Sequence, residues 1–243
     1  MTRLSVNLNK VALIRNARGS NIPDLVQVAK DCERFGAEGI TVHPRPDQRH
    51  TRYDDLAPLK SIVTTEFNIE GNPTSEFLKI VLDIKPHQCT LVPDAPEAIT
   101  SDAGWDTIKH ASFLSEITAE LRANGIRSSL FIDPDLKMLD GAKAVHADRI
   151  EFYTGPYAHE FLKDPESAIS PFAKAARHAQ SLGLGMNAGH DLNLDNLEFF
   201  SSQIPNLLEV SIGHALITDA LYFGLHNVIL MYKQKLQHPN VSS

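Results

Sequence analysis

An apolar, β-branched run at residues 39–42 stops at His43 and is followed at once by a loop rich in basic side chains. The loop carries Arg45, Arg49 and His50, spaced by two prolines. In α/β proteins, substrates bind in the loops just past the C-terminal ends of strands. An imidazole there can transfer protons near neutral pH, and arginines suit phosphate or carboxylate groups. Taken alone, the segment also fits a basic surface loop with one partly buried histidine.

The elements that must position this loop alternate along the whole chain. Short β-branched runs predict eight strands, at residues 4–8, 39–43, 66–70, 88–92, 127–132, 149–153, 185–188 and 209–212. Segments of helical periodicity lie between them. Eight strand–helix units in 243 residues match a (β/α)₈ TIM barrel, whose usual size is about 250 residues. An open doubly wound sheet would normally carry a glycine-rich dinucleotide fingerprint after the first strand, and the sequence has none there.

Helix boundaries are predicted from capping residues and prolines. Pro23 opens the first predicted helix. The pairs Asp133-Pro134 and Ser170-Pro171 each predict a cap followed by the first helical residue. Asn193 is expected to cap another helix, and the last helix is expected to run from about residue 214 to 235. Because no linker-like composition interrupts this alternation, we expect a single domain over residues 1–243, with 238–243 a frayed tail.

Composition narrows the classes of function. The chain is 42% hydrophobic and 22% charged, with a formal net charge of −7, which argues against general nucleic-acid binding. It begins without the long apolar stretch of a signal peptide and has no apolar run of about eighteen residues that would span a membrane. We therefore expect a cytoplasmic protein. Cys32 and Cys89 lie in a helical and a strand pattern, and both are predicted to be buried and reduced.

Polar side chains follow most of the predicted strands. Read in order, the strand ends carry Asn7 and Asn9, His43 and Arg45, Glu70, Thr100 and Ser101, Glu151, Asn187 and His190, and Gly213 and His214. In a barrel these ends meet at one face, so the residues are predicted to form a common site. Carboxylates and imidazoles gathered there are suited to general acid–base catalysis.

Each of these residues also has a purely structural interpretation. Glu70 could be a solvent-facing carboxylate, and Glu151 could pair with Arg149. His190 could be a structural histidine, and Gly213 could serve only a tight turn. These alternatives stay open for any residue taken singly.

Two anion sites are indicated. Gly213-His214 stands at the start of the last predicted helix, where backbone N–H groups and the positive end of the helix dipole favour phosphate. Arg18 could clamp a second anion, although an isolated surface arginine is the commoner case. Zinc motifs such as His-Glu-x-x-His or paired Cys-x-x-Cys are absent from the sequence, so no metal is predicted.

Several of these segments together resemble the pyridoxine 5'-phosphate synthase family, in the same order over essentially the whole chain. The matching pieces are Val6-Asn7, Arg15-Asn16-Ala17-Arg18-Gly19, Gly39-Ile40-Thr41-Val42-His43-x-Arg45 to Arg49-His50, Asn68-Ile69-Glu70, Leu91-Val92-Pro93, Ser129-Leu130-Phe131-Ile132-Asp133, Glu151-x-x-Thr154-Gly155, Asn187-Ala188-Gly189-His190 and Ile212-Gly213-His214. The resemblance implies a (β/α)₈ barrel that condenses 1-deoxy-D-xylulose 5-phosphate with 3-amino-2-oxopropyl phosphate. The products would be pyridoxine 5'-phosphate, phosphate and water. The family's chemistry requires no metal or redox cofactor, and its members assemble as octamers.

The resemblance also implies roles for particular residues. The amino-ketone phosphate would be held by Asn7, Arg18, Gly213 and His214, and the deoxyxylulose phosphate by Arg45, His50 and Thr100. The acid–base groups would be His43 and Glu70 as bases, His190 as proton donor, and Glu151 as the stabiliser of developing positive charge.

Two departures from the family pattern affect substrate binding. Asn9-Lys10 stands where many members have Asp-His, at a pair that contacts the deoxyxylulose phosphate. Asn9 keeps a carbonyl acceptor but loses the charge, and Lys10 could reach a phosphate but cannot mimic a neutral imidazole. Asp191 follows His190 where glycine is common; its N–H could bind phosphate, but its carboxylate would oppose the anion. We expect a variant subgroup with the same reaction.

Two other functions stay open on the residues alone. Another phosphosugar barrel, such as an isomerase or a Schiff-base aldolase, is possible, and Lys10 is the candidate Schiff-base lysine. A non-catalytic phosphate-binding barrel would have no need for His43, Glu70 and His190 together.

Overall fold

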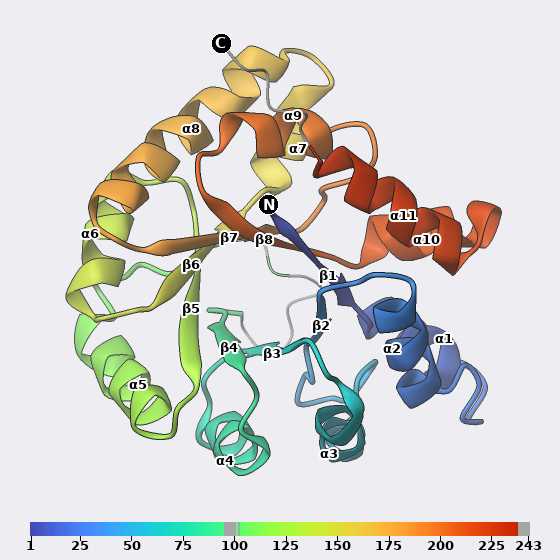
Figure 1. The fold of residues 1–243 in the computed structure, drawn as a ribbon. Coiled ribbons are helices and arrows are strands. Elements are labelled where there is room, and N and C mark those ends of the chain that lie inside the picture. Colours follow the sequence, from blue (N-terminus) through green and yellow to red (C-terminus); the bar gives the residue numbers. More distant parts are fainter. Residues whose placement is uncertain (95–100, 102, 238–243) are drawn as a thin grey trace.

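The computed structural model describes residues 1–94, 101 and 103–237, which form one closed barrel of eight parallel strands with helices outside it (Figure 1). Each strand pairs with the next, and β1 closes the ring on β8, with Arg3 opposite Glu209. The strands are β1 (Arg3–Asn7), β2 (Gly39–Val42), β3 (Glu66–Gly71), β4 (Gln88–Leu91), β5 (Arg127–Ile132), β6 (Arg149–Tyr153), β7 (Gly185–Gly189) and β8 (Leu207–Ile212). The predicted (β/α)₈ barrel is confirmed, and every predicted strand end lies within two residues of the observed one.

Helices connect the strands and cover the barrel wall. They are α1 (Asn9–Asn16), α2 (Leu25–Arg34), α3 (Tyr53–Ile62), α4 (Ser75–Ile84), α5 (Ala111–Ala123), α6 (Leu136–Ala144), α7 (Gly155–Phe161), α8 (Pro165–Ser181), α9 (Leu197–Gln203), α10 (His214–Phe223) and α11 (Leu225–Lys235). The C-terminal helices return to the start of the chain, because α10 packs on α1 and α11 packs on α2 and β1. The last two helices therefore pack against the N-terminal part of the barrel, which contributes Asn7, Asn9 and Lys10 to the cavity described below.

The strands alternate between apolar and polar residues, and the two kinds serve different surfaces. Val6 and Ile69 belong to the apolar core. The intervening polar residues join one another from strand to strand: Ser5 bonds to Thr41 (2.8 Å), and Asn68 donates to Thr41 (3.4 Å). The inside of this barrel is thus a hydrogen-bonded polar layer, where branched apolar residues are the usual filling. The same alternation places a polar residue at the end of several strands.

Two predicted helix starts are wrong. Asp133 does not cap a helix, because its carboxylate accepts the backbone N–H of Gly104 (2.9 Å), and α6 begins later with Asp135 as its cap. Ser170-Pro171 lies inside α8, which begins at Pro165 with Asp164 as its cap. In both cases an aspartate a few positions away supplies the cap, Asp135 for α6 and Asp164 for α8, and local patterns alone do not rank the alternatives.

The ends of two other predicted helices also differ. The Asn193 side chain accepts from the backbone N–H groups of Asp195 and Asn196 in a turn, and α9 begins only at Leu197. The expected single last helix is two helices, because Gly224 takes a φ of 79° between α10 and α11. A positive φ is open to glycine at little cost, and it breaks the helix there.

Cys32 and Cys89 are both buried and carry free thiols, as expected. Over the described residues, the helices are too short or too polar to cross a membrane. The predicted tail, 238–243, lies outside the described residues.

Candidate active site

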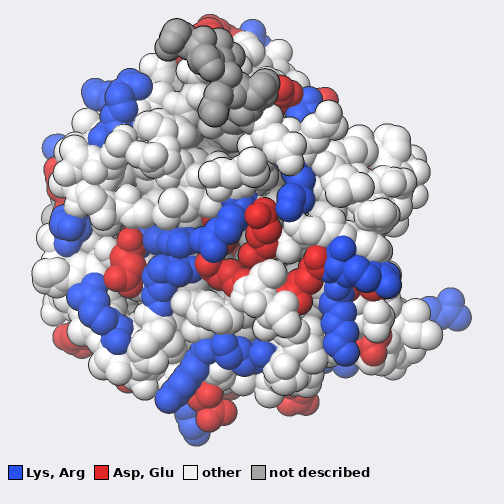
Figure 2. Space-filling model, viewed as in Figure 1, with Lys and Arg blue, Asp and Glu red and all other residues white. Residues whose placement is uncertain are grey.

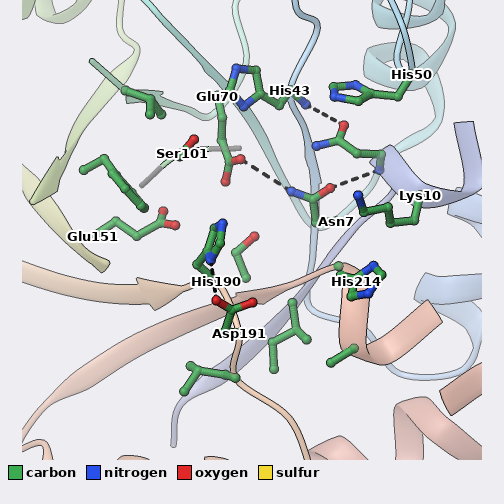
Figure 3. Close-up of a pocket in the computed structure, with 18 of the residues that line it drawn as sticks. Asn7, Lys10, His43, His50, Glu70, Ser101, Glu151, His190, Asp191 and His214 are labelled. Atoms are coloured by element: carbon green, nitrogen blue, oxygen red, sulfur yellow. Dashed lines mark hydrogen bonds and ion pairs between the residues drawn. The ribbon is translucent and has the colours of Figure 1, made fainter. Parts of the chain in front are cut away.

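A cavity of about 400 Å³ opens at the C-terminal ends of the strands. This size suits a small-molecule site. Of the predicted site residues, the following line it: Asn7, Asn9, Lys10, His43, Arg45, His50, Glu70, Glu151, His190, Asp191, Gly213 and His214. Figure 3 shows acidic, imidazole and amide side chains from opposite sides of the barrel pointing toward one space. The fold therefore brings together residues that are far apart in the sequence.

Glu70, at the end of β3, faces the cavity beside Asn7 of β1 (Figure 3). The Asn7 side-chain amide donates to Glu70 Oε2 (3.4 Å). Burial, together with the negative charges of Glu151 and Asp94, raises the pKa of Glu70 well above its ordinary value. The positive charge of Arg45 opposes this only in part. The raised pKa shifts Glu70 toward its protonated form, and a cation bound beside it would favour ionisation.

His43 directly follows β2 and is surrounded by positive charge. Burial lowers its pKa well below the ordinary value, and Arg45, His50 and Arg49 lower it further. The imidazole is therefore neutral at pH 7, the form that accepts a proton. Its ring lies 6.2 Å from that of His50 in an edge-on arrangement.

His50 closes the same loop. Burial and the charges of Arg45, Arg49 and Lys10 lower its pKa to about 4. Within the described part of the chain, its Nδ1 is buried without a hydrogen-bond partner. Buried polar atoms are nearly always satisfied, so an unpaired one at a cavity indicates room for a ligand group.

Arg45 is held by a buried carboxylate. Its Nη2 lies 2.7 Å from Asp94 Oδ2, and Ser101 Oγ donates to the same oxygen (2.6 Å). Both members of the ion pair are buried, with Arg45 4% and Asp94 8% exposed. The guanidinium is thus anchored at one edge of the cavity. Such fixed geometry is what a planar, multi-donor phosphate clamp requires.

Glu151 and His190 form the opposite wall, on β6 and just after β7 (Figure 3). Burial raises the pKa of Glu151 to about 7, against a hydrogen bond from Thr90 and the charge of His190. A Cβ on Gly189 would lie 2.6 Å from Glu151 Oε1. The lack of a side chain at position 189 therefore leaves space for the Glu151 carboxylate. With a pKa of about 7, Glu151 can exchange a proton near neutral pH.

His190 and Asp191 both take left-handed backbone conformations, with φ of 76° and 54°. His190 Nδ1 lies 3.0 Å from Asp191 Oδ2, and this hydrogen bond lowers the pKa of Asp191. The positive φ explains why glycine suits position 191, since glycine adopts this conformation without strain. The carboxylate contacts the imidazole, so its opposition to a bound anion is partly balanced when His190 is protonated.

Gly213 and His214 place the N-terminus of α10 at the cavity. A Cβ on Gly213 would lie 3.1 Å from the Cβ of Asn7, so the glycine allows β1 and this turn to approach closely. Ser211 Oγ also reaches the cavity and is buried without a hydrogen-bond partner among the described residues. Free N–H groups of a helix start beside an unpaired hydroxyl make a ready anion site.

One predicted binding residue lies away from the cavity, and another falls outside the described residues. Arg18 is exposed in the turn after α1 and does not line the cavity. Thr100 lies outside the described residues. Within the residues that the structure covers, no three His, Cys, Asp or Glu side chains are grouped so as to hold a metal ion.

The sequence did not single out Asp94, which follows a strand end and holds Arg45 at the edge of the cavity without lining it. Ser101, which was predicted at the site, and Ser211 both line the cavity, but neither had an assigned role, and Phe131 completes the wall. A rule that examined every polar residue just after a strand would have found Asp94.

The fold and the site together define a (β/α)₈-barrel enzyme whose cavity combines acid–base groups with anion-binding positions. The chain belongs to the family described as pyridoxal phosphate biosynthesis protein PdxJ, whose model matches residues 4–238. It is 60% identical to pyridoxine 5'-phosphate synthase of Flavobacterium johnsoniae over 98% of this chain and 100% of that protein. It is 62% identical to pyridoxine 5'-phosphate synthase of Cytophaga hutchinsonii, with the same coverage.

Solved structures share the fold at low sequence identity. Orotidine 5'-monophosphate decarboxylase from Methanocaldococcus jannaschii aligns over 98% of this chain and 100% of its own, with a TM-score of 0.66 and 12% identity. 3-Keto-L-gulonate-6-phosphate decarboxylase from Vibrio cholerae covers 97% of each chain, with a TM-score of 0.65 and 8% identity. At these identities the likeness supports the barrel alone.

Proposed function

We propose that this chain is a pyridoxine 5'-phosphate synthase, which condenses 1-deoxy-D-xylulose 5-phosphate with 3-amino-2-oxopropyl phosphate. The observation that carries the proposal is one cavity in which a neutral imidazole, His43, faces two carboxyl groups of raised pKa, Glu70 and Glu151. Relatives about 60% identical over their whole length bear this name. A condensation followed by ring closure needs proton transfers at several atoms, and such a set of groups suits it.

Two regions of the cavity suit the two phosphates. Lys10, Arg45 and His50 line one side, and we assign to them the deoxyxylulose phosphate. Gly213 and His214, with Ser211 as an added donor, begin the other region, to which we assign the amino-ketone phosphate. Asn7 and Asp191 adjoin this second region. The roles of Arg18 and Thr100 in substrate binding stay predictions.

The acid–base groups are assigned different roles in proton transfer and charge stabilisation. The substrate amine would attack the ketone to form an imine with loss of water. His43, neutral at pH 7, would take up protons, and His190 would donate them. The raised pKa of Glu70 favours its neutral form, and Glu151, with a pKa of about 7, lies between its two forms near neutral pH. A cationic amine or iminium beside them would draw both toward ionisation, and each carboxylate would then stabilise the charge that ionised it.

Self-association into octamers is part of the proposal. Exposed apolar side chains gather on two helices that pack on each other, Leu13 and Ile14 on α1, and Leu221, Tyr222 and Phe223 on α10. An apolar surface of this kind commonly marks a contact between subunits. Light scattering on the purified protein should give a mass about eight times that of the chain. A monomeric mass would remove this part of the proposal. The predicted cytoplasmic location stays a prediction.

The test of the reaction is direct. The folded protein is incubated with both substrates, and pyridoxine 5'-phosphate is sought by absorbance and mass, with each substrate omitted in turn. Product that depends on both substrates supports the synthase; none from well-folded protein would defeat it. Borohydride in the presence of a ketose phosphate tests the aldolase alternative, because covalent labelling of Lys10 would make that lysine a Schiff-base residue.

A further inference from the structure

Asn9 holds both ends of the loop that carries the basic groups of the site. It is the first residue of α1, and its side-chain oxygen Oδ1 accepts two hydrogen bonds. One comes from the backbone N–H of His43 (2.9 Å) and the other from the hydroxyl of Thr51 (3.0 Å). His43 begins the loop, and the fully buried Thr51 follows its end. A single oxygen therefore joins the two ends.

The loop has little regular structure of its own. Between β2 and α3 its backbone takes no helical or strand conformation, and Gln48 has a φ of 51°. Its internal backbone bonding consists of the Gln48 N–H donated to the carbonyl of Arg45 (2.9 Å). The positions of its side chains must therefore be set by contacts from outside the loop.

Those contacts come largely from α1. Asn16 donates its side-chain amide to the carbonyls of Arg49 (3.1 Å) and His50 (2.7 Å). Arg15, fully buried against Asp55, donates to the His50 carbonyl as well (3.3 Å). These two residues hold the end of the loop and do not line the cavity. Asn9 differs because it lines the cavity and bonds to His43 itself.

The orientation of the Asn9 amide follows from its partners. A backbone N–H can only donate, so the atom facing His43 must be the oxygen of Asn9. The same oxygen has a second lone pair for the Thr51 hydroxyl. The oxygen is thus occupied by protein groups.

We propose that Asn9 is a positioning residue, which sets His43, Arg45 and His50 toward the same cavity through its Oδ1, and that its side chain does not hold the substrate phosphate. This inference rests on the proposed function and deepens it. It separates the two halves of the Asn9-Lys10 departure, because Lys10 remains a phosphate-binding candidate while Asn9 serves the loop.

Two substitutions at this position separate the alternatives. Asn9→Asp keeps an oxygen acceptor, removes the NH₂ donor and adds a negative charge. Asn9→Leu removes the acceptor at similar size. Positioning by Oδ1 predicts that N9D keeps kcat within about threefold, whereas N9L lowers kcat about thirtyfold or more. A direct phosphate contact predicts instead that N9D raises the KM for the deoxyxylulose phosphate tenfold or more, since it replaces a donor with a like charge.

A second measurement does not depend on turnover. Amide hydrogen exchange, followed by mass spectrometry on a peptide that spans residues 43–51, reports whether the loop is held. We expect exchange at least tenfold faster in N9L than in the unaltered protein, and unchanged in N9D. If the unaltered protein makes no product, the synthase proposal fails while this measurement still decides the role of Asn9.

Controls complete the experiment. Thr51→Val removes one of the two donors and should give a smaller loss of kcat than N9L, with no added loss when the two are combined, because both act through one oxygen. T51V also serves if N9L does not fold. Asn227→Leu, an exposed amide on α11, should change neither kcat nor loop exchange. Full turnover and unchanged exchange in N9L, or loss of substrate binding in N9D alone, would overturn the proposal.

Discussion

The two ends of the barrel interior are both polar and buried, yet their charges are arranged in opposite ways. At the floor, where the strands begin, Glu66 meets three arginines. Its carboxylate pairs with Arg3 (3.2 Å), Arg127 and Arg149 (3.6 Å). Acidic and basic side chains are interleaved over the centre of this face (Figure 2). Burial alone would raise the pKa of Glu66, but its bond to Arg127 and the three positive charges lower it.

At the mouth, like groups stand together. Burial and the negative charge of Glu151 raise the pKa of Glu70, and burial and the cationic groups around His43 lower the pKa of that imidazole. Each group is thereby pushed toward its neutral form. The difference teaches that burial of polar groups does not by itself make a site. At the floor Glu66 is paired with opposite charges, whereas at the mouth Glu70 and His43 lie near charges of their own sign, which shift their pKa values.

The largest effect should follow loss of a proton-transfer group at the mouth. His43→Asn removes the imidazole at similar size and should lower turnover about a hundredfold or more, with folding and phosphate binding retained. Steady-state kinetics and the thermal midpoint measure the two properties. His146→Asn is the matched control, because His146 is exposed and Asn also tolerates its positive φ. Equal activity of H43N and H146N would remove His43 from the mechanism.

Loss of the central carboxylate at the floor should act on stability. Glu66→Ala leaves Arg3, Arg127 and Arg149 without this partner. We expect the free energy of unfolding, measured with urea, to fall by about 2–3 kcal/mol. This is at the low end for a broken buried ion pair, because Arg3 and Arg127 reach solvent. Turnover at a temperature where the variant is folded should stay near that of the unaltered protein. Glu116→Ala, an exposed glutamate on α5, is the control and should leave stability unchanged. A large loss of turnover in folded E66A would break the distinction between the two ends.

Glu209, on β8, is affected by charges of both signs, and its titration can be tested by the pH dependence of stability. Burial and the charge of Glu66 raise its pKa to about 8, and Arg149 and Arg3 offset this only in part. Unfolded glutamate loses its proton near pH 4.3, so between about pH 4.3 and 8 the folded state binds more protons. The contribution of Glu209 to the free energy of unfolding is therefore fully present below about pH 4.3 and declines as the pH rises toward about 8.

Glu209→Gln removes this titration. Between pH 5 and 8 the unaltered protein should lose about 2 kcal/mol more unfolding free energy than E209Q, an order-of-magnitude figure for a group of this burial. Urea unfolding at the two pH values measures the difference, and unchanged far-ultraviolet circular dichroism checks the fold. Parallel pH dependence in the two proteins would show that Glu209 ionises normally.

The smallest effect should come from Asp191. Asp191→Asn keeps an oxygen for His190 Nδ1 and removes a negative charge close to the proposed amino-ketone phosphate site. The KM for that substrate should fall about threefold, the scale of one partly exposed charge. Asp195→Asn, on the turn before α9, gives the matched control. An unchanged or higher KM in D191N would mean that the carboxylate does not oppose the anion.

Much of the fold was predictable because the strand signal is local. Each strand has its own apolar–polar alternation, so the eight strands and the residues at their ends followed from short windows of sequence. Helix starts were less predictable, since Asp133 and Asp135 are equally good caps until Asp133 is seen to bind Gly104. The helix α1 was not predicted, and its role in holding the His43 loop depends on contacts between segments distant in the chain.

The sequence by itself determined the barrel, the family and the identity of the groups at the strand ends, because periodicity and residue type act over a few residues. Only the tertiary structure decided which of those groups have partners. It paired Arg45 with Asp94, bonded Asn9 to the backbone of His43 and set Glu70 and Glu151 on opposite walls of one cavity, where the charge of Glu151 raises the pKa of Glu70. Charge effects depend on distance and burial, and both are set only when the strands close into a ring.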